Sequence, residues 1–260
     1  MGEAVMPEQL STTLDGIDVS IAAAGEGPPL LFLHGAGGSN WRPGYDRLAE
    51  RFRVYLPEHP GFGVTERPDW LETIQDLAIW YMDLIDHLQL APVRLVGHSL
   101  GGWTAAELAS LCSHPLRKLV LIDPAGLRIP GEQRPDLFLM NPEESIRTLY
   151  NDQKLADAIL AMQPTPEQAQ AQIRNKNMTA RLGWNPYLCN PALEPRLRRI
   201  KVPSLIVWGK QDRIIPLAHG ELYAQHIPGA KLAVIDHCGH VAPVEQADEF
   251  GRIVGEFLAE

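Results

Sequence analysis

One stretch constrains the folding of this chain more than any other: a Gly-x-Ser-x-Gly sequence at residues 97–101. Mainly apolar residues at 93–96 predict a strand that leads into it, and small residues at 103–111 predict a helix that leaves it. A turn this sharp needs residues without side chains at Gly97 and Gly101. Such a turn holds the Ser99 hydroxyl clear of both elements, so Ser99 is a candidate nucleophile. An ordinary Ser/Gly turn is the alternative.

The composition narrows the class of protein. With 45% hydrophobic and 21% charged residues, 260 residues can bury a large core, as one large domain or two small ones. The 23 basic and 32 acidic residues give a net charge of −9, which disfavours nucleic acid and anionic membranes as partners. The three cysteines are widely spaced, which disfavours a disulfide framework and a metal site. We find no secretory or membrane-spanning signal, and expect a cytoplasmic protein.

Strands and helices alternate along much of the chain. Residues 12–24 predict an edge hairpin, broken at Asp15 and Gly16. Further apolar runs predict strands at 30–33, 52–56, 93–96, 118–122, 203–209 and 231–235. Helical spacing predicts helices at 41–51, 73–90, 103–111, 217–226 and 244–258. This alternation is typical of β-α-β units in a largely parallel sheet.

The alternation stops between residues 127 and 199. This segment shows only helical and turn patterns, at 142–151, 155–162 and 166–182, with prolines between them. We therefore expect a core domain made of residues 1–126 and 200–260, and a helical insertion at 127–199.

A glycine-rich loop follows the strand at 30–33, beginning His34-Gly35-Ala36 and continuing with two more glycines. It lacks the Gly-Lys-Ser/Thr ending of a P-loop and the Gly-x-Gly-x-x-Gly spacing, which disfavours nucleotide binding. Its backbone N–H groups can instead approach a developing oxyanion closely. We expect the amides of Ala36 and Leu100 to form an oxyanion hole, and His34 to pack within the loop.

A serine nucleophile needs an imidazole to take its proton and a carboxylate to orient that imidazole. Asp212 and His240 follow the two strands after the insertion, and the carboxyl ends of parallel strands meet at one edge of a sheet. We expect Ser99, Asp212 and His240 to meet there. Asp123, at another strand end, is the alternative acid, and His237 is the alternative base.

The order Ser…Asp…His and the glycine landmarks resemble the α/β-hydrolase superfamily. The landmarks lie at residues 34–38, 60–63, 97–102, 209–212 and 239–240. The resemblance implies a mostly parallel eight-stranded sheet flanked by helices, with a helical cap inserted after the sixth core strand. One departure is Glu58 followed by His59, because the family often has Asp at that strand end. His98 is expected to pack behind the nucleophile, and Cys238 to be a bystander.

The resemblance also implies a serine hydrolase without a metal or organic cofactor, acting on a small molecule as a monomer or homodimer. Our first hypothesis is a carboxylesterase for small or medium esters that works through an acyl-enzyme. The side chains or backbone expected to line its pocket are Gly37, Phe138, Met140, Trp184, Leu188 and Val241.

Two alternatives remain for the function. The first is a C–C hydrolase that resembles the meta-cleavage-product hydrolases in size and cap position, although those enzymes usually have Trp where this chain has Val241 and Asn where it has His98. The second is a small-molecule receptor on the same fold. Haloalkane dehalogenases and epoxide hydrolases are disfavoured because their nucleophile is Asp, where this chain has Ser99.

Overall fold

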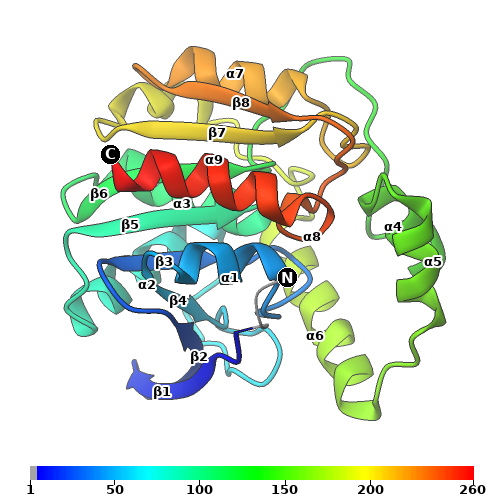
Figure 1. Ribbon diagram of the computed structural model, residues 1–260, viewed down its shortest axis with the longest axis horizontal. Coiled ribbons are helices and arrows are strands. Elements are labelled where there is room, and N and C mark those ends of the chain that lie inside the picture. The colour runs from blue at the N-terminus through cyan, green and yellow to red at the C-terminus, as the bar shows by residue number, and fades with distance from the viewer. Residues whose placement is uncertain (1–4) are drawn as a thin grey trace.

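The computed structural model describes residues 5–260 and contains one eight-stranded sheet (Figure 1), with the spatial order β1-β2-β4-β3-β5-β6-β7-β8. Its strands are β1 (Glu8–Leu14), β2 (Ile17–Ala24), β3 (Pro29–Leu33), β4 (Arg53–Pro57), β5 (Val93–His98), β6 (Leu116–Ile122), β7 (Ser204–Gly209) and β8 (Lys231–Ile235). The strands from β3 to β8 pair in parallel, whereas β2 pairs antiparallel with both β1 and β4. The expected mostly parallel sheet is therefore confirmed.

Helices cover both faces of this sheet. They are α1 (Pro43–Ala49), α2 (Ile74–His87), α3 (Leu100–Leu111), α7 (Ala218–His226), α8 (Ala242–Glu245) and α9 (Ala247–Ala259). One apolar cluster joins α2, α3 and α7 to one face of the strands, and a second joins α1 and α9 to the other face. Strands β5, β6 and β7 are almost wholly buried between these layers, as the apolar runs in their sequences require.

Between β6 and β7 lie only helices and loops: α4 (Pro142–Leu149), α5 (Gln153–Ala161), α6 (Pro166–Gly183) and the 3-10 helix η1 (Glu194–Arg199). Proline in the first turn and an Asn141 or Thr165 capping box start α4 and α6. Helices α4, α5 and α6 stand beside the carboxyl ends of the strands (Figure 1). In the described part of the chain, no helix is both long and apolar enough to span a membrane.

Several boundaries differ from those expected. The edge strand β1 begins at Glu8 rather than Thr12, because the polar residues of an exposed edge strand carry no apolar signal. Helix α1 is shorter than 41–51, beginning at Pro43. The terminal helix is divided into α8 and α9 at Gln246, whose φ of −132° and ψ of 51° leave the helical region.

Candidate active site

Ser99 occupies a sharp turn between β5 and α3. Its φ of 55° and ψ of −114° are strained for a residue with a side chain. A Cβ on Gly97 would lie 2.3 Å from the oxygen of Gly101, and a Cβ on Gly101 would lie 2.1 Å from the oxygen of Leu33. The Ser99 amide donates to the carbonyl oxygen of Ile122 at 2.9 Å, and the carbonyl oxygen of Ser99 accepts from the Trp103 amide. These contacts fix the turn with the serine side chain outward.

Ser99, His240 and Asp212 form a hydrogen-bonded chain at the carboxyl edge of the sheet. The His240 Nε2 lies 2.8 Å from the Ser99 Oγ, and the His240 Nδ1 lies 2.6 Å from the Asp212 Oδ2. Because a carboxylate can only accept, Nδ1 carries the hydrogen and Nε2 is free to accept the serine proton. Both His240 and Asp212 are buried. The geometry suits proton transfer from the serine hydroxyl.

Further hydrogen bonds hold Asp212 and His240 in place. The second oxygen of Asp212, Oδ1, accepts from the amides of Ile214 at 2.7 Å and Ile215 at 3.0 Å. His98 donates from Nε2 to the carbonyl oxygen of His240 at 2.7 Å. Burial lowers the pKa of His98 to about 3, so its ring stays neutral. His98, which precedes Ser99 in sequence, thus contacts the backbone of His240.

The alternative acid, Asp123, lies beside Asp212 and His240, whereas the alternative base, His237, lies at the surface. Asp123 is fully buried, its Oδ1 accepts from the Gly209 amide at 2.9 Å, and its Oδ2 has no partner in residues 5–260. Burial and the nearby Asp212 hold the pKa of the Asp123 carboxyl well above its usual range, which favours the neutral acid. His237 is exposed at the sheet edge. Over residues 5–260, the His240 ring bonds to Ser99 and Asp212 and to neither Asp123 nor His237.

The Leu100 amide directly follows the serine in sequence, and the Ala36 amide belongs to the glycine-rich loop after β3. Over residues 5–260, neither amide donates a hydrogen bond to the protein. Leu100 is the first residue of α3, where the amides of a helix point outward without an acceptor. A Cβ on Gly35 would lie 3.2 Å from the Ser99 Cβ, so the loop passes close to the serine. This arrangement can place two donors around an oxyanion.

A buried hydrogen-bond network fixes the start of the glycine-rich loop after β3. The rings of His34 and His59 stack with centroids 3.6 Å apart. His34 donates from Nδ1 to the Gly35 oxygen and accepts the His59 amide on Nε2. His59 donates from Nε2 to the His34 oxygen and accepts from the Tyr81 hydroxyl on Nδ1. Burial lowers the pKa of His34 to about 4. The pKa of His59 is also lowered, mainly by burial and to a lesser extent by the nearby His34. Both rings are therefore neutral structural groups.

The structure explains the unusual Glu58. Its Oε2 accepts from the amides of Val64 and Thr65 at 2.9 and 3.0 Å, and from the Thr65 hydroxyl at 2.9 Å. Gly63 has a φ of 50°, and its missing Cβ leaves the space that the Glu58 carboxylate fills. On the other side, the Gly63 amide donates to Asn175 of α6 at 2.8 Å. The sequence alone did not indicate these partners.

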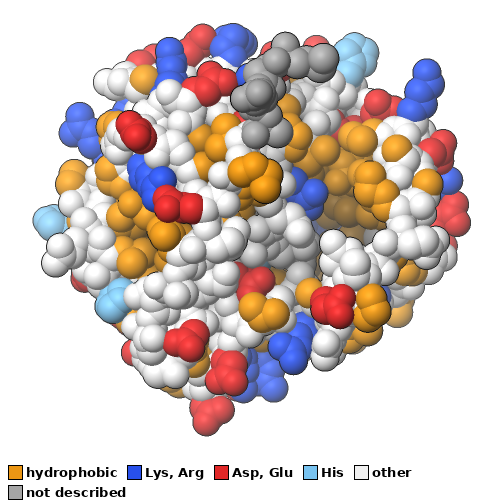
Figure 2. Space-filling model, turned by 60° about the horizontal axis from the view of Figure 1, so that its bottom comes forward, with side chains coloured by type: hydrophobic (Ala, Val, Ile, Leu, Met, Phe, Trp, Pro, Cys, Tyr) orange, Lys and Arg blue, Asp and Glu red, His pale blue; other side chains and the backbone are white. Residues whose placement is uncertain are grey.

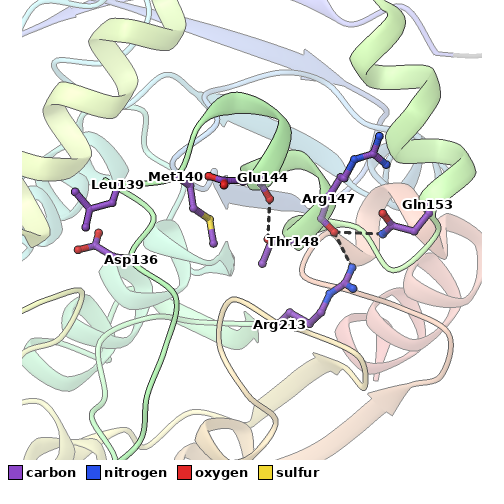
Figure 3. Close-up of a pocket in the computed structure, with 8 residues that line it drawn as sticks. All are labelled: Asp136, Leu139, Met140, Glu144, Arg147, Thr148, Gln153 and Arg213. Carbon is purple, nitrogen blue, oxygen red and sulfur yellow. Dashed lines mark hydrogen bonds between the residues drawn. The ribbon is translucent and has the colours of Figure 1, made fainter.

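A hollow of about 660 Å³ opens between α4 and the loop that carries Asp212. Figure 2 shows hydrophobic side chains gathered in a hollow on one face of the molecule. Figure 3 shows Arg213 and Arg147 on one side of the hollow, with Asp136 and Leu139 across from them. Among the lining residues are Asp136, Leu139, Met140, Glu144, Arg147 and Arg213.

The residues expected to contact substrate fall into different surroundings. Met140 lines the hollow, and Gly37 faces open space, with no atom within 4 Å of a Cβ placed on it. Phe138 packs against Trp184 at a centroid distance of 5.3 Å, and Trp184 is 58% exposed. Leu188 is buried in the apolar cluster that covers the sheet.

Val241, the last of the residues expected to contact substrate, precedes α8 and is partly buried. Cys238, the expected bystander, is also fully buried, and burial raises the pKa of its thiol, which keeps the thiol protonated.

One group of side chains has the types of a metal site. Ring nitrogens of His98 and His240 and a carboxylate oxygen of Asp123 lie within 4.8 Å of one another. Both nitrogens of His240 already bond to Ser99 and Asp212, and the His98 Nε2 bonds to a carbonyl. Three of the four ring nitrogens are thus already engaged in hydrogen bonds within the protein, whereas the Asp123 Oδ2 has no partner in residues 5–260.

A model of the Alpha/beta hydrolase family matches residues 30–253. The chain belongs to this family. A 2-hydroxy-6-oxo-6-phenylhexa-2,4-dienoate hydrolase of Comamonas testosteroni is 31% identical over 91% of this chain and 90% of that protein. A 2-hydroxymuconate semialdehyde hydrolase of Pseudomonas sp. (strain CF600) is 32% identical over 94% of this chain and 92% of that protein.

Two solved structures have a similar fold. The meta-cleavage product hydrolase CumD of Pseudomonas fluorescens IP01 has a TM-score of 0.81 and 25% identity, over 96% of this chain and 97% of that one. A carboxylesterase of Bacillus subtilis has a TM-score of 0.78 at 23% identity, over 98% of this chain and 92% of that one, which supports the fold alone. Our first hypothesis from the sequence is ester hydrolysis, whereas the named relatives favour the alternative, C–C bond hydrolysis.

Proposed function

We propose that this protein is a serine hydrolase that cleaves a carbon–carbon bond next to a carbonyl group, in a conjugated keto acid of the 6-oxo-dienoate type. The observation that carries the hydrolase proposal is the single imidazole of His240 placed 2.8 Å from the Ser99 Oγ and 2.6 Å from the Asp212 Oδ2. The substrate class comes from the relatives, several of which are named for 6-oxo-dienoates.

Each group has a role in the proposed reaction. His240 takes the hydroxyl proton as the Ser99 Oγ forms a bond to the carbonyl carbon, and the amides of Ala36 and Leu100 stabilise the oxyanion. The carbon–carbon bond then breaks, and its electron pair passes into the conjugated acid, which takes a proton that His240 returns. Water activated by His240 releases the acyl group and regenerates Ser99. Asp212 stabilises the imidazolium in both halves.

Ester hydrolysis is the second candidate, and two residues favour it. His98 and Val241 stand where the meta-cleavage-product hydrolases usually have Asn and Trp. The same triad would expel an alkoxide, which needs less stabilisation than a carbanion. A cytoplasmic location, the oligomeric state and the covering of the site by α4, α5 and α6 remain predictions.

A substrate panel tests these proposals. We expect turnover of a 6-oxo-dienoate, measured by loss of its conjugated absorbance, to exceed turnover of p-nitrophenyl esters of graded chain length. Ser99→Ala should abolish both. Faster turnover of the esters would favour the carboxylesterase. If the wild-type protein turns over no compound but binds one by calorimetry, and Ser99→Ala binds it equally well, the protein is a receptor and the hydrolase proposal fails.

A further inference from the structure

The helical insertion contacts the backbone of the proposed base directly. The His240 amide donates to the oxygen of Leu149, the last residue of α4, at 2.8 Å. The carbonyl oxygen of His240 accepts a hydrogen bond from His98. The position of the imidazole therefore depends on a segment more than 90 residues away in the sequence, at the junction of α4 and α5.

Glu245 ties the same junction to the residue before the base. Its Oε1 accepts from the Asp152 amide at 2.8 Å, and its Oε2 accepts from the Gly239 amide at 2.6 Å. Burial raises the pKa of Glu245, while these backbone donors act in the opposite direction. One partly buried carboxylate of α8 thus bridges the insertion and the loop that carries His240.

Gly239 shows how closely the two segments approach. A Cβ at this position would lie 2.5 Å from the Leu149 oxygen, 2.8 Å from the Asn151 nitrogen and 2.9 Å from the Glu245 Oε2. A side chain would push the junction away from the base. The α4–α5 junction therefore packs directly against the backbone of Gly239.

Arg213 adds a second tie, from the residue that follows the proposed acid. Its Nη2 donates to the carbonyl oxygen of Arg147 at 2.7 Å (Figure 3). It also donates to the carbonyl oxygen of Tyr150 at 2.6 Å. These oxygens lie at the carboxyl end of α4, where the last carbonyls of a helix have no partner within it and favour a cation. Arg213 also lines the 660 Å³ hollow.

We propose that Glu245 and Arg213 form a clamp that positions His240 and Asp212 only while residues 147–152 are docked. The proposal rests on the hydrolase function proposed above and adds a control on it. Arg213 and α4 also line the 660 Å³ hollow, so a molecule bound there would contact the same junction. Glu245 and Arg213 are positioning residues, since neither touches the serine.

The test compares Glu245→Gln with Glu249→Gln, a matched change at an exposed glutamate of α9 that does not contact the insertion. Glu245→Gln places an amide NH₂ against backbone donors, so we expect kcat to fall about 10-fold to 100-fold with little change in KM. Glu245→Asp, which keeps two acceptors, should recover part of the loss. Glu249→Gln should match the wild type.

Amide hydrogen exchange gives a readout that does not need turnover. Glu245→Gln and Arg213→Gln should both speed exchange of the amides at 149–152 and 239–240, and leave those of β5 unchanged. Arg213 is exposed, so its variant provides the answer if Glu245→Gln does not fold.

Unchanged exchange and unchanged kcat would overturn the clamp. A change in KM alone, or equal loss in Glu245→Gln and Glu245→Asp, would also overturn it. If the wild-type protein has no turnover, the hydrolase proposal fails by the substrate panel, and exchange still decides whether the clamp exists.

Discussion

At the scale of single residues, the site holds Ser99 in a strained backbone conformation. A left-handed φ at a residue with a side chain costs about 1–3 kcal/mol. Backbone bonds to Ile122, Trp103 and Ala125 hold the turn, and two glycines give it room. The strain places the hydroxyl against His240 before any substrate arrives, which removes an ordering step from the reaction.

Two buried aspartates near the base should differ sharply in importance. Asp212→Asn removes the charge that stabilises the His240 imidazolium, and we expect kcat to fall about 10⁴-fold, as for the triad carboxylate of a serine protease. Asp123→Asn replaces an acid that its surroundings keep neutral, so its loss should be far smaller. Steady-state kinetics on both variants, with circular dichroism to confirm folding, would measure this. The reverse order would make Asp123 the acid.

At the scale of elements, the loops after β3 and β4 form one unit. The stacked imidazoles of His34 and His59 join the strand ends, and Glu58 ties down the loop at residues 61–65. Asn175 of α6 reaches this loop from the insertion. The loops after β3 and β4 are thus held by contacts from three separate parts of the chain.

Replacing Gly63 tests this loop. Gly63→Ala would place a Cβ 1.9 Å from the Glu58 Oε1 in a backbone with φ of 50°. Gly229→Ala is the control, because Gly229 has φ of 72° with no atom within 4 Å of its Cβ. The control should lose about 1 kcal/mol of unfolding free energy from the backbone alone. Urea unfolding should show a larger loss for Gly63→Ala; equal losses would mean that Glu58 moves aside freely.

Local patterns predicted most elements and the residues that meet at the sheet edge. Apolar runs located the buried strands, and the parallel order then brought Ser99, Asp212 and His240 to one edge. The division at Gln246 was missed because the apolar spacing of 244–258 continues across it. The roles of Glu58, Asn175 and Glu245 were missed because most of their partners are backbone groups, which leave no trace in side-chain patterns.

At the scale of the whole molecule, several imidazoles are buried without charge. His98 has a pKa lowered from 6.5 to about 3, so between these values the unfolded chain binds a proton that the native protein does not. Stability is therefore full above pH 6.5 and falls as the pH decreases. His34, lowered to about 4, acts in the same direction.

His98→Asn should weaken this acid sensitivity. At pH 5 the wild type should have lost about 2 kcal/mol through His98, since one pKa unit corresponds to about 1.4 kcal/mol. The variant should lose that much less between pH 7.5 and 5, whatever its absolute stability. Urea unfolding at both pH values measures the difference, with the exposed His114→Asn as control. Identical pH dependence in wild type and His98→Asn would show that His98 is charged when folded.

The chain order of the triad also governs when the site can exist during synthesis. Ser99 and its turn are translated before the insertion, whereas Asp212 and His240 come after it. The junction at residues 147–152 therefore leaves the ribosome well before the histidine loop on which it rests. A nascent chain that has made only the first six strands carries a serine with neither base nor acid. By the proposed mechanism, the hydroxyl becomes reactive only after the second half of the sheet has docked, so the serine would be activated only in the finished fold.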